Sequence, residues 1–351
     1  MKEFKKPTQA LQEAMETLTH VSGVDAAAPR TRKLVVILPA LNEEKTISDV
    51  LGRVPRRMEG FDEVELLVID DGSTDATVKL ARDSGAKVVS HSENMGVGAA
   101  FHTGIRTALQ SGATVIVNID SDGQFNPLDI PELIAPIMDG RAQFVTATRF
   151  ADPELTPKMP TAKLWGNKTI TYMINFLTKK HFTDTSCGFR AYSREAALRL
   201  TLFGHFTYTQ ESLIDLSFKN ITMIEVPLKI RGEREHGKSR VASNLWRYGL
   251  KAATIMFRTA RDYKPHYFFG VPGLTIFGAG IVAGLFLLRH YLVTGQTSPY
   301  RSLVQLSSVL IIVGFLLLFI SLLADMLHRN RVIAEEAVYH ARKASYGGTS
   351  N

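Results

Sequence analysis

Residues 33–44 read KLVVILPALNEE, residues 63–75 read EVELLVIDDGSTD, and residues 115–124 read VIVNIDSDGQ. In each of these stretches a short run rich in Val, Ile and Leu ends in polar and acidic residues. Short apolar runs that alternate with helical stretches are typical of βα units, which build a mostly parallel sheet. The pattern therefore predicts a Rossmann-like α/β domain with polar residues after its strands.

The predicted domain covers residues 33–240 and follows a polar extension over residues 1–32. Its expected strands cover residues 34–38, 64–69, 87–90, 115–119 and 144–148, and its expected helices cover residues 43–53, 74–84 and 98–110. In open α/β sheets the ligand binds at the carboxyl ends of the strands. The candidates for a binding site are therefore the residues that follow the first, second and fourth runs, which include Pro39, Asn42, Glu43, Asp70, Asp71, Asp120, Asp122 and Gln124.

Asp120 and Asp122 form an Asp-x-Asp pair at the end of a predicted strand. Two carboxylates at this spacing can hold one divalent cation, and their hard oxygens favour Mg²⁺ or Mn²⁺, with Gln124 able to supply a further oxygen. The alternative is a pair of solvated turn acids, which would be the better interpretation if the neighbouring strand ends were not polar. Because they are polar, we expect a metal site in which the cation bridges a diphosphate as a nucleotide leaves.

The C-terminal part of the chain contains two uncharged apolar segments, Tyr267–Leu288 and Leu303–Ala324. Each has the roughly 20 residues that a helix needs to cross a bilayer. We therefore predict a hairpin of two transmembrane helices over residues 267–327 and a tail over residues 328–351, with a pair of buried core helices as the alternative. Basic residues flank both ends of the hairpin. The positive-inside rule then predicts an integral membrane protein whose α/β domain and termini are cytoplasmic.

The net charge of +7 is concentrated beside the predicted hairpin, because residues 231–264 contain nine Lys or Arg and three Asp or Glu. Such a segment suits anionic headgroups or a phosphorylated ligand, whereas nucleic acid is disfavoured by the hairpin that follows; a solvated charged face is the alternative. Residues 241–266 are predicted as a juxtamembrane amphipathic helix, which would lie at the membrane interface, pack on the sheet domain, or do both. The single cysteine, Cys187, excludes an intrachain disulfide.

Six motifs, in this order, resemble those of the inverting family-two glycosyltransferases of GT-A fold, and among them dolichol-phosphate mannose synthase and related polyprenyl-phosphate glycosyltransferases. They are Pro39-Ala40-Leu41-Asn42-Glu43, Asp70-Asp71-Gly72-Ser73-Thr74-Asp75, Asn94-Met95-Gly96-Val97-Gly98, Asp120-Ser121-Asp122-Gly123-Gln124, Asp184-Thr185-Ser186-Cys187-Gly188-Phe189-Arg190 and His236-Gly237-Lys238-Ser239. The resemblance covers roughly Lys33 to Lys264. One departure is Cys187, where many relatives carry Ser, and it weakens an assignment to mannose.

The resemblance implies a role for each motif residue. Pro39, Asn42, Glu43, Asp70 and Asp71 would contact the base and ribose of a nucleotide sugar, and Asp120, Asp122 and Gln124 would hold the metal and the diphosphate. Arg149 would face a phosphate, and the basic segment with Arg231, Arg234, Lys238 and Ser239 would approach the diphosphate and a lipid phosphate. The catalytic candidates are Asp122, Arg149, Asp184 and Arg190.

Two acidic residues keep open roles. Asp184 could bind sugar hydroxyls, orient Arg190 or act as a base, and Glu211, on an expected helix, could contact the sugar or pair with a basic neighbour.

The expected activity is transfer of a hexose from a nucleotide sugar of the GDP-mannose or UDP-glucose type to a polyprenyl or dolichyl phosphate. A phosphate monoester is largely ionised at neutral pH and can attack without a strong base, and one displacement would invert the anomeric carbon. The alternatives are a transferase that acts on another membrane lipid or a polysaccharide, and a non-catalytic membrane scaffold that binds nucleotide sugars. A homo-oligomer is compatible with the sequence.

Overall fold

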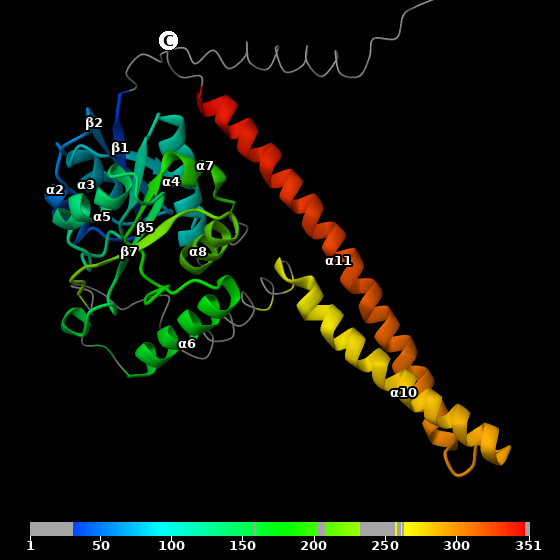
Figure 1. The fold of residues 1–351 in the computed structure, drawn as a ribbon. Coiled ribbons are helices and arrows are strands. Elements are labelled where there is room, and N and C mark those ends of the chain that lie inside the picture. The colour runs from blue at the N-terminus through cyan, green and yellow to red at the C-terminus, as the bar shows by residue number, and fades with distance from the viewer. Residues whose placement is uncertain are drawn as a thin grey trace, which may run out of the picture.

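The protein, as a computed structural model, is described over residues 31–157, 159, 161–201, 208–231, 257, 261 and 263–347. These residues form a sheet domain and a long helical hairpin that projects from it (Figure 1). The sheet has seven strands in the order β3-β2-β1-β4-β6-β5-β7. Of these strands, only β6 runs antiparallel to its neighbours, β4 and β5. The strands are β1 (Lys33–Ala40), β2 (Glu63–Asp70), β3 (Lys87–Ser90), β4 (Val115–Asn118), β5 (Phe144–Thr148), β6 (Arg190–Ser193) and β7 (Met223–Pro227).

Helices cover both faces of this sheet, because strand residues alternate between two hydrophobic clusters. In β1, Leu34, Val36 and Leu38 belong to one cluster and Val35 and Ile37 belong to the other. The first cluster is covered by α2 (Ile47–Arg53), α3 (Thr77–Asp83) and α5 (Ile130–Met138). The second is covered by α4 (Val97–Gln110), α6 (Thr161–Thr178), α7 (Arg194–Arg199) and α8 (Tyr208–Phe218). Two short 3₁₀ helices, Pro127–Asp129 and Pro153–Leu155, connect the layers.

The mostly parallel α/β fold predicted from the sequence is confirmed. All five predicted strands form, and the bounds of those at residues 87–90 and 144–148 are the predicted ones. The predicted helices form as α2, α3 and α4, although α2 and α3 begin a few residues later than expected. The helix expected around Glu211 forms as α8. The sequence interpretation missed β6, β7 and the helices α5, α6 and α7.

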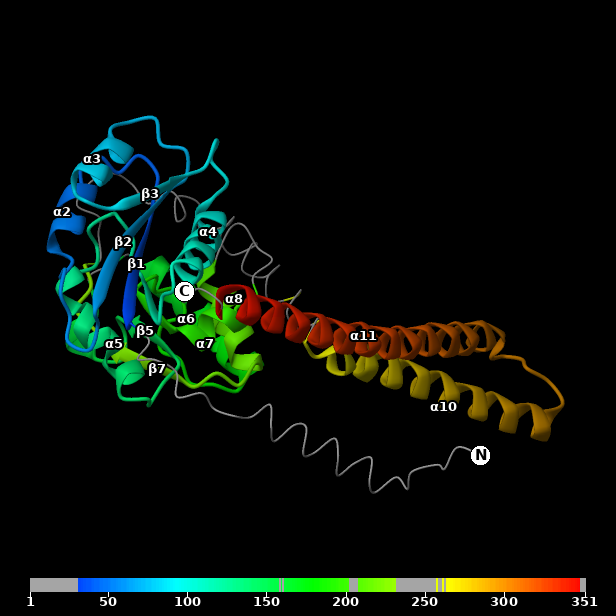
Figure 2. The ribbon, with the colours of Figure 1, turned by 90° about the horizontal axis from the view of Figure 1, so that it is seen from above.

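Two apolar helices follow the sheet domain and pack side by side (Figure 2). A π-helical turn, His266–Gly270, leads into α10 (Val271–Thr294), and α11 covers Arg301–Gly347. Both are long and apolar enough to cross a membrane, and most of their apolar residues are not buried in the protein. Glycines allow the two helices to approach closely. A Cβ added at Gly280 would lie 2.8 Å from the backbone nitrogen of Ile311, and one added at Gly314 would collide with the backbone of Phe277. Such close backbone approach is typical of helix pairs in membranes.

Helix α11 continues without interruption past position 327 and returns to the sheet domain (Figure 1). Residues 328–347 belong to the segment predicted as a tail, and they form a helical arm that contacts α7 and α8. The Tyr339 hydroxyl donates to Glu195 at 3.1 Å, and Arg342 Nη1 donates to the carbonyl of Leu200 at 2.7 Å. The juxtamembrane helix predicted over residues 241–266 lies almost entirely outside the described residues.

Candidate active site

The ends of β1 and β2 are joined by side chains that the sequence predicted as ligand contacts. Asn42 has a left-handed backbone, with φ +52°, which lets its side chain accept from the amide of Thr74 at 2.8 Å. The amide of Asn42 in turn donates to Ser73 Oγ at 2.9 Å, and the carboxylate of Asp70 accepts from the amide of Ser73 at 2.9 Å. These bonds fix the two loops against each other at one edge of the sheet.

Asp71 organises the next loop of the same edge. Its buried carboxylate accepts from the amides of Met95 and Gly96 at 2.9 and 2.8 Å and contacts His91 Nδ1 at 2.8 Å. Gly96 has φ +93°, a conformation that other residues rarely adopt. The Asn-Met-Gly motif therefore wraps this loop around the carboxylate of Asp71.

The first residues after β1 are tied to the acidic turn after β4. The carbonyl of Pro39 accepts from Ser121 Oγ at 2.8 Å, and Thr46 Oγ1 donates to the carbonyl of Ser121 at 2.7 Å. Thr46 also contacts the Glu43 carboxylate at 3.4 Å. Residues from the ends of β1, β2 and β4 are thus assembled at one edge, as the sequence predicted.

Asp120 and Asp122 follow β4 in this turn, and Asp122 is almost completely buried. Asp122 Oδ1 accepts from the amide of Gln124 at 3.1 Å, which closes the turn. Gln124 is joined twice to Arg231: its Nε2 donates to the Arg231 carbonyl at 3.3 Å, and its carbonyl accepts from the Arg231 amide at 3.1 Å. The basic segment therefore begins beside the acidic pair.

The acidic turn offers two carboxylates and an amide to a cation. No group of three or more His, Cys, Asp or Glu side chains that could enclose a metal exists within the described parts of the chain. A donor set of two carboxylates fits Mg²⁺ or Mn²⁺ that takes its other ligands from a substrate diphosphate and water. The residues present thus suit a cation that binds together with its substrate.

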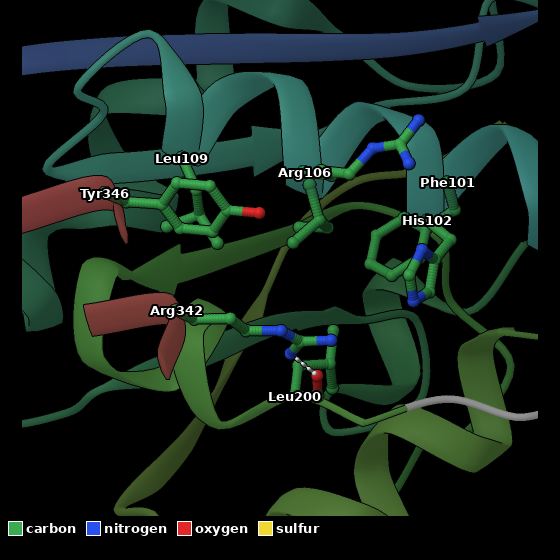
Figure 3. A pocket seen from close by; sticks show the side chains of 8 residues that line it. Phe101, His102, Arg106, Leu109, Leu200, Arg342 and Tyr346 are labelled. Atoms are coloured by element: carbon green, nitrogen blue, oxygen red, sulfur yellow. Dashed lines mark hydrogen bonds between the residues drawn. The ribbon is translucent and has the colours of Figure 1, made fainter. Parts of the chain in front are cut away.

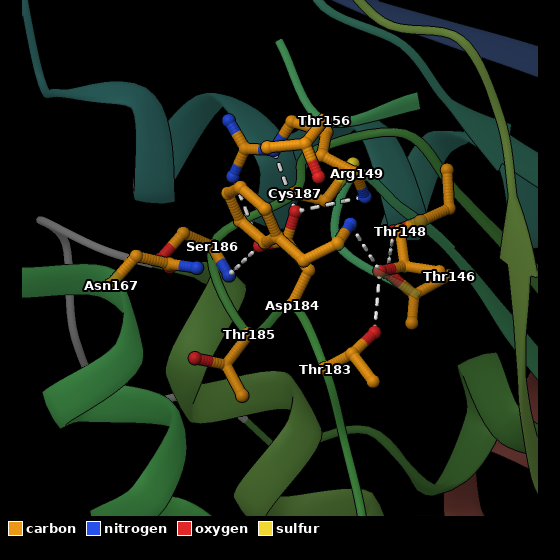
Figure 4. Close-up of polar contacts among 12 residues, drawn as sticks. Thr146, Thr148, Arg149, Thr156, Asn167, Thr183, Asp184, Thr185, Ser186 and Cys187 are labelled. Atoms are coloured by element: carbon orange, nitrogen blue, oxygen red, sulfur yellow. Dashed lines mark hydrogen bonds and ion pairs between the residues drawn. The ribbon is translucent and has the colours of Figure 1, made fainter. Parts of the chain in front are cut away.

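A bidentate ion pair lies at the end of β5 (Figure 4). Arg149 Nε and Nη2 donate to the two oxygens of Asp184 at 2.6 and 2.9 Å, and Asp184 is completely buried while the Arg149 side chain keeps 20 % exposure. The Asp184 carboxylate also accepts from the amide of Ser186 at 3.0 Å. The sequence placed both residues in the site but did not predict that they pair with each other.

Glu225 on β7 is a site residue that sequence reasoning missed. Its carboxylate accepts from the amides of Thr183 and Asp184 at 2.7 and 3.0 Å, and so fixes the backbone that presents Asp184. Burial raises the pKa of Glu225 above its usual range, while these hydrogen bonds oppose the rise. Nothing in the local pattern of residues 223–227 signals this contact, because the partners are about 40 residues away in sequence.

Arg190 is completely buried, and within the described part of the chain its guanidinium contacts carbonyl and hydroxyl oxygens and not Asp184. Its Nε donates to the carbonyl of Cys187 at 2.7 Å, and its Nη1 donates to Thr209 and Ser212 at 2.6 Å each. The guanidinium therefore ties the 184–190 motif to α8, which is a positioning role. Burial raises the pKa of the neighbouring Cys187 thiol to about 12, so this thiol is not ionised at neutral pH.

The structure describes one of the four remaining predicted site residues, Glu211, and not the other three. Glu211 lies half-buried in the first turn of α8. Arg234, Lys238 and Ser239 lie outside the described residues. A separate pocket with about 50 Å³ of space is lined by residues of α4 and of the end of α11, and it contains no predicted site residue (Figure 3).

The acidic turn after β4 and the partly exposed Arg149 lie on a mixed α/β sheet, which is the arrangement expected of a glycosyltransferase of GT-A fold. Residues 35–201 match the family model that is described as Glycosyl transferase family 2. A UDP-N-acetylglucosamine–dolichyl-phosphate N-acetylglucosaminyltransferase of Methanococcus voltae is 30 % identical over 216 residues, which cover 56 % of this chain and 84 % of the relative. A polyprenol monophosphomannose synthase of Mycolicibacterium smegmatis is 29 % identical over 68 % of this chain and 90 % of its own.

The fold is also found in a solved structure. Glucosyl-3-phosphoglycerate synthase from Mycobacterium tuberculosis in complex with UDP is 25 % identical, with a TM-score of 0.50 over 65 % of this chain and 80 % of that chain. The chain belongs to glycosyl transferase family 2.

Proposed function

We propose that the protein transfers a hexose from a nucleotide sugar of the GDP-mannose or UDP-glucose type to a polyprenyl or dolichyl phosphate, with inversion of the anomeric carbon. The observation that carries the proposal is the acidic turn after β4, which lies in one chain with a helical hairpin suited to a membrane. The similarity to enzymes whose names contain dolichyl-phosphate and polyprenol monophosphomannose supports the acceptor class.

The donor would bind across the loops that Asn42 and Asp71 shape, with its diphosphate at Asp120 and Asp122. A divalent cation held there would offset the negative charge that develops on the departing nucleotide. Arg149, held by Asp184, would face the reacting phosphates, because a bidentate carboxylate fixes the direction of a guanidinium. Arg231, joined to Gln124, would bring the basic segment to the same diphosphate.

The acceptor needs positioning more than deprotonation, because a lipid phosphate is already largely ionised at neutral pH. We propose that the hairpin lies in the cytoplasmic membrane with both termini cytoplasmic, so that the phosphate meets the donor at the membrane surface. The effective concentration gained by holding both reactants in one plane is a recognised source of rate acceleration.

The proposal is tested with radiolabelled UDP- and GDP-sugars and vesicles that contain polyprenyl phosphate. We expect one donor to give a lipid-linked sugar that mild acid releases, and we expect chelator to abolish the reaction and Mn²⁺ or Mg²⁺ to restore it. Asp122→Asn should lower turnover at least about 100-fold. Asp139→Asn, an exposed carboxylate at the end of α5, is the matched control and should leave turnover unchanged.

Two results would contradict the proposal. Nucleotide-sugar binding without release of the nucleotide would favour a non-catalytic scaffold. Transfer to another lipid or to a polysaccharide, but not to polyprenyl phosphate, would leave a glycosyltransferase with a different acceptor.

A further inference from the structure

Tyr208, the first residue of α8, brings a phenol to the acidic turn. Its ring is buried and stacks on Phe101 of α4, with centroids 4.2 Å apart and planes 13° apart. Its hydroxyl lies 3.4 Å from Asp120 Oδ1 and 2.9 Å from Asn118 Nδ2. No sequence motif pointed to Tyr208, because it is separated from Asp120 by 88 positions.

The neighbours of Tyr208 fix the direction of its hydroxyl proton. Asn118 Nδ2 lies 2.9 Å from the carbonyl of Gly188, which can only accept, so this atom of Asn118 must be the amide nitrogen. Its second hydrogen is then donated to the Tyr208 oxygen. Because that oxygen accepts from Asn118, its own proton is left to be donated to the carboxylate of Asp120.

Gly188 closes the other side of this contact. A Cβ at position 188 would lie 2.8 Å from Asp120 Oδ2 and 2.9 Å from the Tyr208 hydroxyl, closer than real Cβ atoms approach. The motif glycine therefore allows the Asp120 carboxylate and the phenol to meet against the backbone.

We propose that Tyr208 is a positioning residue that sets the orientation of the Asp120 carboxylate toward the divalent cation of the donor complex. The inference rests on the proposed function, since it assigns Asp120 to that cation. Hydrogen-bond partners of metal-binding carboxylates commonly set metal affinity, and their loss typically weakens it about 10-fold or more.

Tyr208→Phe tests this role, because the variant keeps the stacked ring and removes only the hydroxyl. Two quantities are measured in full-length protein: the Mn²⁺ concentration that half-saturates turnover, and the affinity for UDP with and without Mn²⁺ by calorimetry. We expect the half-saturating Mn²⁺ concentration to rise about 10-fold and the Mn²⁺-dependent gain in UDP affinity to shrink similarly. Metal-free UDP binding and the metal-free melting temperature should stay near those of the wild type.

Tyr192→Phe is the matched control, because it removes another buried hydroxyl from the same aromatic cluster, on β6. We expect it to leave the Mn²⁺ dependence unchanged. A wild-type Mn²⁺ dependence in Tyr208→Phe, or an equal shift in Tyr192→Phe, overturns the positioning role alone. A wild-type protein whose UDP binding and turnover ignore Mn²⁺ overturns both this inference and the metal assignment of the proposed function.

Discussion

The pairing of Asp184 with Arg149 suggests a role for Asp184 besides the three that the sequence left open, which were binding sugar hydroxyls, orienting Arg190 and acting as a base. Both oxygens of this fully buried carboxylate accept from the guanidinium, and one also accepts from the amide of Ser186. A general base needs an oxygen that can reach the proton of the acceptor. The geometry therefore favours Asp184 as the residue that orients Arg149, whose side chain is the partly exposed member of the pair.

The first prediction concerns this pair. Arg149→Lys and Asp184→Asn should each lower kcat by roughly 10- to 1000-fold, and the double variant should be little worse than either, because residues that act as a unit have strongly non-additive effects. Steady-state kinetics of the three variants and their pH–rate profiles measure this. If Asp184 were instead the base, Asp184→Asn would remove the acidic limb of the wild-type profile, while Arg149→Lys would retain that limb.

At the scale of elements, the sequence predicted strands wherever an apolar run ends in polar residues, and β1 to β5 obey this rule. The sequence interpretation missed β6, because its residues Arg-Ala-Tyr-Ser place a guanidinium inside the core, and it missed β7, because the five residues of that strand include Glu225.

The acids after β1, β2 and β4 were predictable because strand ends share one edge of a sheet. Contacts such as Asp184 with Arg149 were not, since they depend on tertiary packing between residues 35 positions apart.

The element that the sequence described least well is the last part of α11. It is held to α8 by a partly buried ionic cluster in which Lys219 Nζ lies 2.9 Å from Asp215 and 3.2 Å from Glu335, while Arg331 lies 2.7 Å from Glu335. Burial raises the pKa of Asp215 above its ordinary value, against the opposing effect of Lys219. Because α8 begins with Tyr208, this cluster connects the helical hairpin to the helix that reaches the acidic turn.

We predict that Glu335→Ala loosens the helical arm. The change leaves Lys219 and Arg331 without one partner in a poorly solvated place, which should cost roughly 1–3 kcal/mol. Limited trypsin digestion at Arg342 and Lys343 should then proceed about 10-fold faster or more, while the sheet domain remains intact. Arg329→Ala is the control, since its side chain on the same helix is 76 % exposed. Equal cleavage rates in wild type and Glu335→Ala would show that the ionic cluster does not hold the arm.

At the scale of the whole molecule, α6 carries an aromatic face that is exposed in the described part of the chain. Its Ile170, Ile174 and other apolar residues enter the core, whereas Trp165, Tyr172 and Phe176 are 72, 71 and 78 % exposed. These three residues lie on one side of α6, because they are seven and four residues apart and residues at such intervals share a face of a helix. Lys264 Nζ donates to the carbonyl of Leu177 at 2.7 Å, which joins the end of α6 to the start of the hairpin.

Exposed Trp and Tyr beside apolar membrane helices are typical of residues at the level of lipid headgroups. With the hairpin in a bilayer, α6 would therefore rest its aromatic face on the same membrane surface. Figure 1 shows α6 at the border of the sheet domain, on the side from which α10 departs. The active site would then be held at a fixed height by two separate contacts with the membrane, the hairpin and α6.

The last prediction uses the fact that the chain has only two tryptophans, Trp165 and Trp246. In a Trp246→Phe variant reconstituted into vesicles, Trp165 fluorescence should be quenched by brominated phospholipid and protected from aqueous iodide, because an interfacial indole lies within the acyl–headgroup boundary. The control carries Trp165→Phe, Trp246→Phe and Gln110→Trp, which places the indole at the exposed end of α4, near the arm formed by the end of α11. This indole should respond to iodide and not to brominated lipid. If Trp165, like the control indole, were quenched by iodide and not by brominated lipid, α6 would lie away from the bilayer. The hairpin alone would then determine where the sugar donor meets a lipid acceptor.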